Sequence, residues 1–331
     1  MRPLSCITTC FNEGPLLARA VKSVLSQSFE DFQYIIVDDG ADRATRAVLA
    51  EINDPRVLLI RQPNAGLSVA RNRALAQATG RYVCFLDGDD SRPAWAFQAL
   101  LAAACEGSNA HRPADLVLGR GVLATADGHL GRFYDDARFA RIAALTAAGR
   151  QGTARALAAL IEPQSANKLV RRSLLEQGTI AFPAGRCFED IHFHVATLSY
   201  ARRVAFLQTP CFAYYRRYGR AQITATRGAR LLDILPVVEG MLALFARRPG
   251  FVEPLARATV LAAGLKMMDW CARRIAPSLG AEFRRRATGL LRALPPGFAD
   301  ALLAVDPGLD PALPLARRAL LGWRPELAVR S

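Results

Sequence analysis

The chain has 331 residues, of which 51% are apolar and 22% are charged, a composition that can build a sizeable core and excludes a mainly disordered or fibrous chain. At about 150 residues per domain, the length predicts roughly two domains. The formal net charge is +14, and the stretch from Arg216 to the end holds 19 Arg and Lys against 9 Asp and Glu, which favours a polyanionic partner such as nucleic acid, an anionic membrane surface or a phosphorylated substrate.

The first 120 residues alternate between strand and helix patterns. Short apolar and β-branched runs predict strands at residues 4–9, 32–37, 57–60, 82–86 and 116–118. Apolar residues at helical spacing predict helices at about 15–25, 44–52, 67–78 and 93–105, with Asn12 as the N-terminal cap of the first and Gly80 as the C-terminal cap of the third. This alternation implies βαβ units and a mostly parallel sheet flanked by helices.

The rest of the chain is less regular. A helical stretch is mixed with short strands between residues 133 and 217, and from about residue 222 the sequence is helical and rich in Leu, Ala and Arg, which predicts a C-terminal helical appendix. The seven cysteines include no C-x-x-C pair, which fits a reducing compartment. We expect no signal peptide and no transmembrane helix, because no long apolar stretch opens the chain and no uncharged apolar run reaches about 18 residues. A cytoplasmic protein follows.

Three polar clusters stand at the carboxyl ends of predicted strands, where ligands of parallel sheets bind: Thr9–Asn12, Asp38–Gly40 and Asp87–Asp90. The last of these, Asp-Gly-Asp-Asp, puts three carboxylates within four residues, and such oxygen ligands suit Mg²⁺ or Mn²⁺ bridging to phosphate. The other interpretation is a solvated acidic turn ahead of a helix. The Asp38–Gly40 cluster is either a site for a base or ribose or a plain turn.

Two further features bear on chemistry. Glu189 and Asp190 open an apolar helix, so they are either a general base facing a cleft or carboxylates favoured by the helix dipole. Arg71 is expected to pair with a nucleotide or with a carboxylate such as Asp39. No G-x-G-x-x-G follows the first strand and no phosphate-binding G-x-x-x-x-G-K-[ST] occurs, which argues against a Rossmann dinucleotide enzyme and a P-loop NTPase.

In this order, the clusters resemble glycosyltransferase family 2, whose members have the GT-A fold and invert configuration. The resemblance covers about residues 1–217 and rests on six stretches: TTCFNE at 8–13, LSQSFEDFQYIIVDDG at 25–40, DPRVLLIRQPNAGLSVARNRAL at 54–75, GRYVCFLDGDD at 80–90, NKLVRRSLL at 167–175 and FPAGRCFEDIHF at 182–193. It implies a GT-A glycosyltransferase domain over residues 1–217, with a nucleotide-binding half at 1–120 and an acceptor half with the catalytic base at 121–217. Residues 218–331 would be a basic helical region of unknown role.

The resemblance also implies roles for individual positions, which are of three kinds. The donor-binding set is Thr9, Phe11, Asn12, Asp39, Arg71 and Asp87. The metal set is Asp87, Asp89 and Asp90, holding Mn²⁺ or Mg²⁺. The catalytic set is Asp190 as general base with Glu189 beside it.

The implied activity is transfer of one sugar from a nucleotide-diphosphate sugar, with UDP favoured, to a saccharide, lipid-linked or other hydroxyl acceptor in cell-surface polysaccharide or glycoconjugate synthesis. No specific nucleic-acid partner is expected. The basic C-terminal region has two open interpretations: a peripheral contact with the inner face of an anionic membrane, or a helical cap with solvated Arg side chains. Two other functions stay open at this point, a nucleotidyltransferase and a non-catalytic polyanion-binding protein.

Overall fold

The computed structural model describes residues 2–105, 113–125, 127–215 and 226–329. The chain forms two compact units. The first unit consists of residues 1–140, 164–185 and 200–218, and the second consists of residues 141–163, 186–199 and 219–331. Each unit is therefore built from more than one stretch of the sequence.

The first unit is built on one mixed sheet with the strand order β3-β2-β1-β4-β7-β5-β6, and β8 pairs with β5. The strands are β1 (Leu4–Cys10), β2 (Phe32–Asp39), β3 (Val57–Gln62), β4 (Tyr82–Phe85), β5 (Leu116–Ala124), β6 (Leu130–Arg132), β7 (Lys168–Arg171) and β8 (Val204–Tyr215). Strands β1 to β4 are mutually parallel, as are β5 and β8, whereas β7 runs antiparallel to both β4 and β5. The α/β class with a mostly parallel sheet is thus confirmed.

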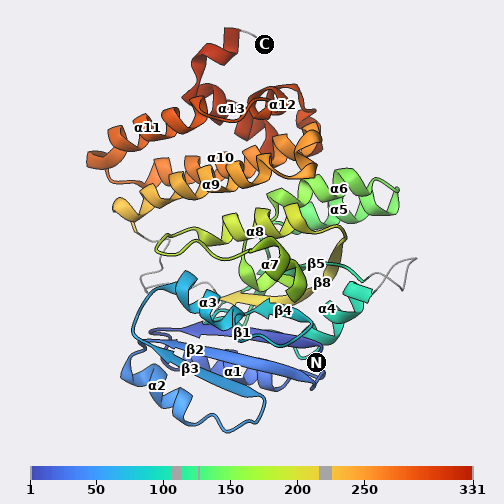
Figure 1. Cartoon of the computed structure of the whole chain (residues 1–331), viewed down its shortest axis with the longest axis vertical. Coiled ribbons are helices and arrows are strands. Elements are labelled where there is room, and N and C mark those ends of the chain that lie inside the picture. The colour runs from blue at the N-terminus through green and yellow to red at the C-terminus, as the bar shows by residue number, and fades with distance from the viewer. Residues whose placement is uncertain (1, 106–112, 126, 216–225, 330–331) are drawn as a thin grey trace. The chain divides into compact units, whose positions relative to one another are not determined.

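Helices cover the sheet of the first unit. They are α1 (Leu16–Leu25), α2 (Arg43–Ala50), α3 (Leu67–Leu75), α4 (Ala96–Cys105) and α7 (Arg172–Gly178). Helices α1 and α2 lie on one face of β1–β3 and α3 on the other (Figure 1). Every residue of β1 is buried, and the apolar residues of α1 pack with those of β1, β2 and α4 in one core. The apolar runs form strands here because both faces of the sheet are covered.

The second unit is helical. Helix α5 (Asp136–Ala147) enters it from the first unit, and the remaining helices are α6 (Gln151–Leu157), α8 (Glu189–Tyr200), α9 (Ile234–Ala246), α10 (Pro254–Arg274), α11 (Pro277–Arg292), α12 (Phe298–Ala304) and α13 (Ala312–Trp323). Helix α10 packs against α6, α9, α12 and α13. The helical C-terminal region is therefore confirmed, but residues 141–163 and 186–199, predicted to belong with residues 1–217, pack in this unit instead. The reason is that α10 buries apolar surface against them.

Two predicted helix caps are wrong. Helix α1 begins at Leu16 after Gly14 and Pro15, so Asn12 is too early to cap it, and Pro15 supplies the helical backbone angle instead. Helix α3 ends at Leu75 rather than at Gly80. Gly80 serves a packing role: its N–H donates to Ser5 Oγ at 2.9 Å, and a Cβ at this position would lie 2.4 Å from the Ser5 nitrogen.

Among the described residues, no helix is long and apolar enough to cross a membrane.

Candidate active site

The three predicted polar clusters meet along one edge of the first unit's sheet. Strand β1 lies between β2 and β4, with Cys10 paired to Asp38 in the register. The N–H of Leu86 donates to the Ile7 carbonyl at 2.9 Å, which continues the β1–β4 pairing toward the acidic turn. Because these three strands are parallel, their carboxyl ends fall on the same edge. The structure thus brings Thr9, Asp39 and the turn that starts at Asp87 to neighbouring strand ends.

The Asp39 carboxylate is fully engaged by protein donors and is only 4% exposed. Its Oδ1 accepts from Gln62 Nε2 at 2.7 Å and from the Ala65 N–H at 2.8 Å. Its Oδ2 accepts from Asn64 Nδ2 at 3.2 Å and from the Gly66 N–H at 2.9 Å. Asp39 therefore shapes the loop after β3, and Gln62 and Asn64 are site residues that the sequence reasoning missed.

Arg71 pairs with Asp87, not with Asp39. Its Nη2 lies 2.6 Å from Asp87 Oδ1, and its side chain is only 4% exposed while that of Asp87 is 40% exposed. The guanidinium also lies over the ring of Phe182, 5.0 Å from the centroid. The buried Arg71 guanidinium holds one carboxylate oxygen of Asp87, while part of the Asp87 side chain stays open to solvent.

Gly88 allows the acidic turn to approach the end of β1 closely. A Cβ on Gly88 would lie 3.2 Å from the Thr9 carbonyl oxygen and 3.0 Å from Glu13 Cγ. Glu13, which the sequence reasoning did not single out, accepts a hydrogen bond from the Phe11 N–H at 2.6 Å. That bond fixes the loop after β1, on which the Phe11 side chain is exposed and Asn12 is half-buried.

The three carboxylates of the turn differ in their surroundings. Asp90 is 1% exposed, and its Oδ1 accepts from the Tyr215 N–H at 3.0 Å. Burial, reinforced by the Asp87 carboxylate, raises the pKa of Asp90 well above its usual range. No group of three His, Cys, Asp or Glu residues in the described ranges is arranged to hold a metal ion. Asp87 and Asp89 still match the one or two carboxylates that Mg²⁺ takes beside substrate phosphates.

Glu189 and Asp190 belong to the second unit, where they form the first turn of α8. Glu189 is 7% exposed, whereas Asp190 is half-buried and its Oδ1 accepts from the Ile191 N–H at 2.9 Å. The residue just before them, Phe188, has a φ of +66°, which is strained for a residue other than glycine. Strained backbone gathers at functional sites, so this feature, invisible in the sequence, draws attention to the start of α8.

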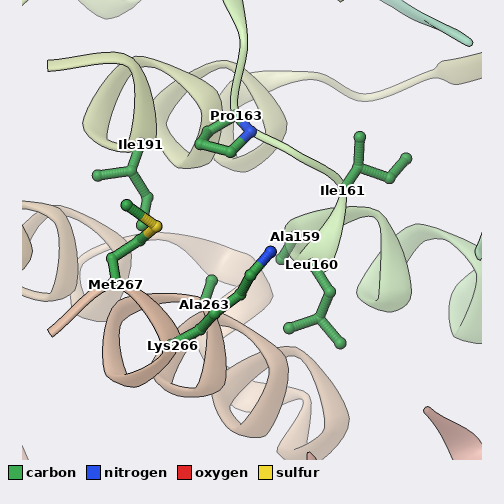
Figure 2. A pocket seen from close by; sticks show the side chains of 8 residues that line it. All are labelled: Ala159, Leu160, Ile161, Pro163, Ile191, Ala263, Lys266 and Met267. Carbon is green, nitrogen blue, oxygen red and sulfur yellow. The ribbon is translucent and has the colours of Figure 1, made fainter. Parts of the chain in front are cut away.

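A small pocket within the second unit lies between α8, α10 and the segment after α6 (Figure 2). Its lining is mainly apolar: Ala159, Leu160, Ile161, Pro163, Ile191, Ala263, Lys266 and Met267. The Lys266 ammonium pairs with the Glu162 carboxylate. None of the predicted site residues lines this pocket.

Similarity to known proteins agrees with the fold. The model of Glycosyl transferase family 2 matches residues 5–115. Residues 5–115 therefore form a glycosyltransferase family 2 domain, as the motifs predicted. This segment contains the donor-site and metal-site residues predicted above, whereas Glu189 and Asp190 lie outside it.

A curated relative is the putative teichuronic acid biosynthesis glycosyltransferase TuaG of Bacillus subtilis, 43% identical over 93 residues, which is 27% of this chain and 37% of TuaG. This chain spans about a third of the length of the first such relatives.

Among solved structures, Staphylococcus aureus TarS 1–349 in complex with UDP-GlcNAc has a TM-score of 0.69 at 18% identity, covering 97% of this chain and 89% of that one. The mannosyltransferase PcManGT of Pyrobaculum calidifontis, in complex with GDP-Man and Mn²⁺, has a TM-score of 0.53 at 19% identity, covering 98% and 86%. These likenesses show that the fold is the GT-A fold of glycosyltransferases.

Proposed function

We propose that the chain is an inverting glycosyltransferase that moves one sugar from a nucleotide-diphosphate sugar, with UDP favoured, to an acceptor hydroxyl. The observation that carries the proposal is the meeting of three polar strand ends at one sheet edge inside a family 2 domain. The relative TarS binds UDP-GlcNAc and PcManGT binds GDP-Man, which supports a nucleotide-sugar donor.

Asp87 and Asp89 are the residues that would hold Mn²⁺ or Mg²⁺. A bound divalent ion would neutralise the negative charge that develops on the departing diphosphate. The presence of Mn²⁺ in the PcManGT complex supports this assignment. Asp90, committed to the Tyr215 N–H and buried, is assigned to holding the turn rather than to the metal.

The other residues bind and orient the reactants. The exposed ring of Phe11 offers an apolar face to the nucleobase, Thr9 and Asp39 shape the edge that receives the base and ribose, and Arg71 holds the Asp87 carboxylate. Asp190 takes the proton from the acceptor hydroxyl as that oxygen attacks the anomeric carbon. Attack on the face opposite the leaving group inverts the configuration. Glu189 directly precedes this base in the chain and is more buried than Asp190, so we assign it a place beside the base.

Calorimetric titration with UDP and GDP, in Mn²⁺ and in EDTA, tests the donor site. We expect Mn²⁺ to tighten the binding of one diphosphate, and we expect this tightening to be lost in Asp89→Ala and kept in Asp31→Ala, a control at an exposed carboxylate of the same unit. We expect Asp190→Asn to keep binding and to lose transfer by about 10²-fold or more. Absence of nucleotide binding by the folded wild type would overturn the proposal. Release of pyrophosphate instead of a nucleoside diphosphate would indicate a nucleotidyltransferase.

We also propose that the acceptor is a saccharide, lipid-linked or other hydroxyl compound and that the enzyme works in the cytoplasm at the inner face of an anionic membrane. The exposed Arg284, Arg285 and Arg286 of α11 support an electrostatic contact. Flotation with phosphatidylglycerol vesicles at low salt should carry the protein upward, and phosphatidylcholine vesicles should not. Equal flotation with both, or with neither, would contradict the membrane contact.

A further inference from the structure

Arg19 reaches the centre of the acidic turn from helix α1. Its Nη2 donates to the main-chain carbonyl of Asp89, and its Cζ lies 3.3 Å from the centroid of the Tyr215 ring, so the guanidinium stacks on that ring. Helix α1 is itself fixed, because Leu17, Ala20 and neighbouring apolar residues of the helix are buried in the core. The contact therefore links a rigid helix to the backbone that carries the Asp89 carboxylate.

The turn is anchored to β8 immediately after this contact, at Asp90 and Ser91. The Tyr215 N–H binds the Asp90 carboxylate at 3.0 Å, and Ser91 and Ala213 exchange N–H to carbonyl bonds of 3.2 and 2.8 Å. Tyr215 thus uses its backbone to hold Asp90 and its ring to hold Arg19. These anchors leave the Asp89 peptide as the part of the turn that Arg19 fixes.

Arg92 secures the base of the turn without touching Asp89. It is 3% exposed and donates to the carbonyls of Phe85, Ala166 and Cys211 at 2.6, 2.8 and 2.8 Å. The two arginines therefore have different roles, since Arg92 holds the strand that leads into the turn and Arg19 holds the middle of the turn.

We propose that Arg19, stacked on Tyr215, is a positioning residue that sets the Asp89 carboxylate for the divalent ion. This inference rests on the proposed function, because it assigns the metal to Asp87 and Asp89. Two observations favour positioning over plain stabilisation. The bond goes to the peptide of the candidate ligand itself, and the stacked geometry is kept although the buried Nε–H of Arg19 has no hydrogen-bond partner among the described residues. A planar guanidinium can donate to the Asp89 carbonyl and also stack flat on the Tyr215 ring, whereas a lysine ammonium can donate the hydrogen bond but cannot stack.

The full chain offers a matched control. Arg56, in the same unit, also lies over an aromatic ring, with its Cζ 4.6 Å from the Phe32 centroid, and also donates to a main-chain carbonyl, that of Leu25, at 2.9 Å. It makes these contacts away from the acidic turn. Arg56→Ala therefore removes both kinds of interaction that Arg19→Ala removes, and in addition an ion pair with Asp54, without touching the turn.

The experiment measures Mn²⁺ affinity by the electron paramagnetic resonance signal of free Mn²⁺, at saturating UDP, together with the Kd of UDP in EDTA. We expect Arg19→Ala to weaken Mn²⁺ binding roughly tenfold, as loss of a hydrogen bond to a charged group would, with the Kd of UDP in EDTA unchanged. Arg19→Lys should recover part of the loss, Tyr215→Phe should behave as wild type, and Tyr215→Leu should resemble Arg19→Ala. Arg56→Ala should leave both constants unchanged, whatever its effect on the melting temperature.

Three results would overturn the inference. These are Mn²⁺ affinity in Arg19→Ala equal to that of Arg56→Ala, an equal loss of UDP affinity with and without Mn²⁺, or wild-type UDP binding that does not depend on metal. In these cases UDP still binds the wild type and the donor site stands. Wild-type protein that binds no UDP or GDP overturns the proposed function as well, so the two failures are distinguishable. If Arg19→Ala does not fold, Tyr215→Leu against Tyr215→Phe decides.

Discussion

Asp39 organises the sheet edge through the loop that follows β3. The carboxylate accepts two backbone N–H groups, from Ala65 and Gly66, and two side-chain amides. Both of its oxygens are occupied and it is almost fully buried. The shape of the loop, and with it the groups that the loop offers to a ligand, therefore depends on a charge that lies beneath the surface.

Replacing Asp39 with Asn should destabilise the protein and weaken nucleotide binding. The amide keeps the size of the side chain, but its Nδ2 cannot accept, so two N–H donors lose their partner and meet another donor. We expect a loss of about 2–4 kcal/mol in the free energy of unfolding, measured by urea denaturation. Asp31→Asn, at an exposed position, should stay within about 0.5 kcal/mol of wild type. Equal stability of the two variants would show that the loop does not depend on the carboxylate.

Sequence reasoning identified Asp39 as a site residue but not the groups around it. The motif Asp38-Asp39-Gly40 at a strand end is a local signal. The partners of Asp39 lie 23 to 27 residues further on, and only the pairing of β2 with β3 brings them close. The same limit applies to Asp90, whose partner Tyr215 is 125 residues away. Type and position of a polar residue are visible in a sequence, whereas its long-range partner is not.

Gly80 joins the end of the α3 region to the sheet. Its position against β1 leaves no space for a side chain, because the two nearest clashing atoms are backbone atoms of Leu4 and Ser5. Gly80→Ala should therefore destabilise the protein by about 3 kcal/mol or more, because the strand cannot move aside as a flexible side chain would. Gly289→Ala, at an exposed position in the last turn of α11 with nothing within 4 Å of a new Cβ, should instead stabilise by about 0.5–1 kcal/mol. Thermal and urea unfolding of the two variants would reveal the contrast, and a mild Gly80→Ala would contradict the close packing.

The predicted strands and helices of residues 1–105 match the structure to within a few residues because apolar periodicity and burial coincide there. Strand β7 has no such signal. It begins with Lys168, which is fully buried and donates from Nζ to the Gln164 carbonyl at 2.6 Å and to Asn167 Oδ1 at 2.8 Å. The strand begins with a charged residue and is only four residues long, so the sequence pattern does not predict it. Its place between β4 and β5, antiparallel to both, follows from tertiary packing alone.

Each of the two units is assembled from stretches that are separate in the sequence, so the folding of one stretch depends on distant parts of the chain. The second unit combines residues 141–163 and 186–199 with residues 219–331, and α10 packs on α6 and on the short helix at Ala158–Leu160. Cutting the chain near residue 217, where a sequence-based boundary falls, would strip apolar partners from both fragments. Residues 226–331 would then bury too little apolar surface to balance the loss of chain entropy. Residues 1–217 would keep the core of the first unit but would leave residues 141–163 and 186–199 without their partners.

We therefore expect a fragment of residues 226–331 to lack cooperative unfolding when expressed alone. We expect this fragment and one of residues 1–217 both to bind the dye ANS. Co-expressed, the two should form a complex with a sharp thermal transition, because α10 regains its contacts with α6. Circular dichroism melting and ANS fluorescence would measure both properties, with the full chain as the reference. A 1–217 fragment that binds no more ANS than the full chain would contradict the expectation and show that residues 141–163 and 186–199 fold without the C-terminal helices.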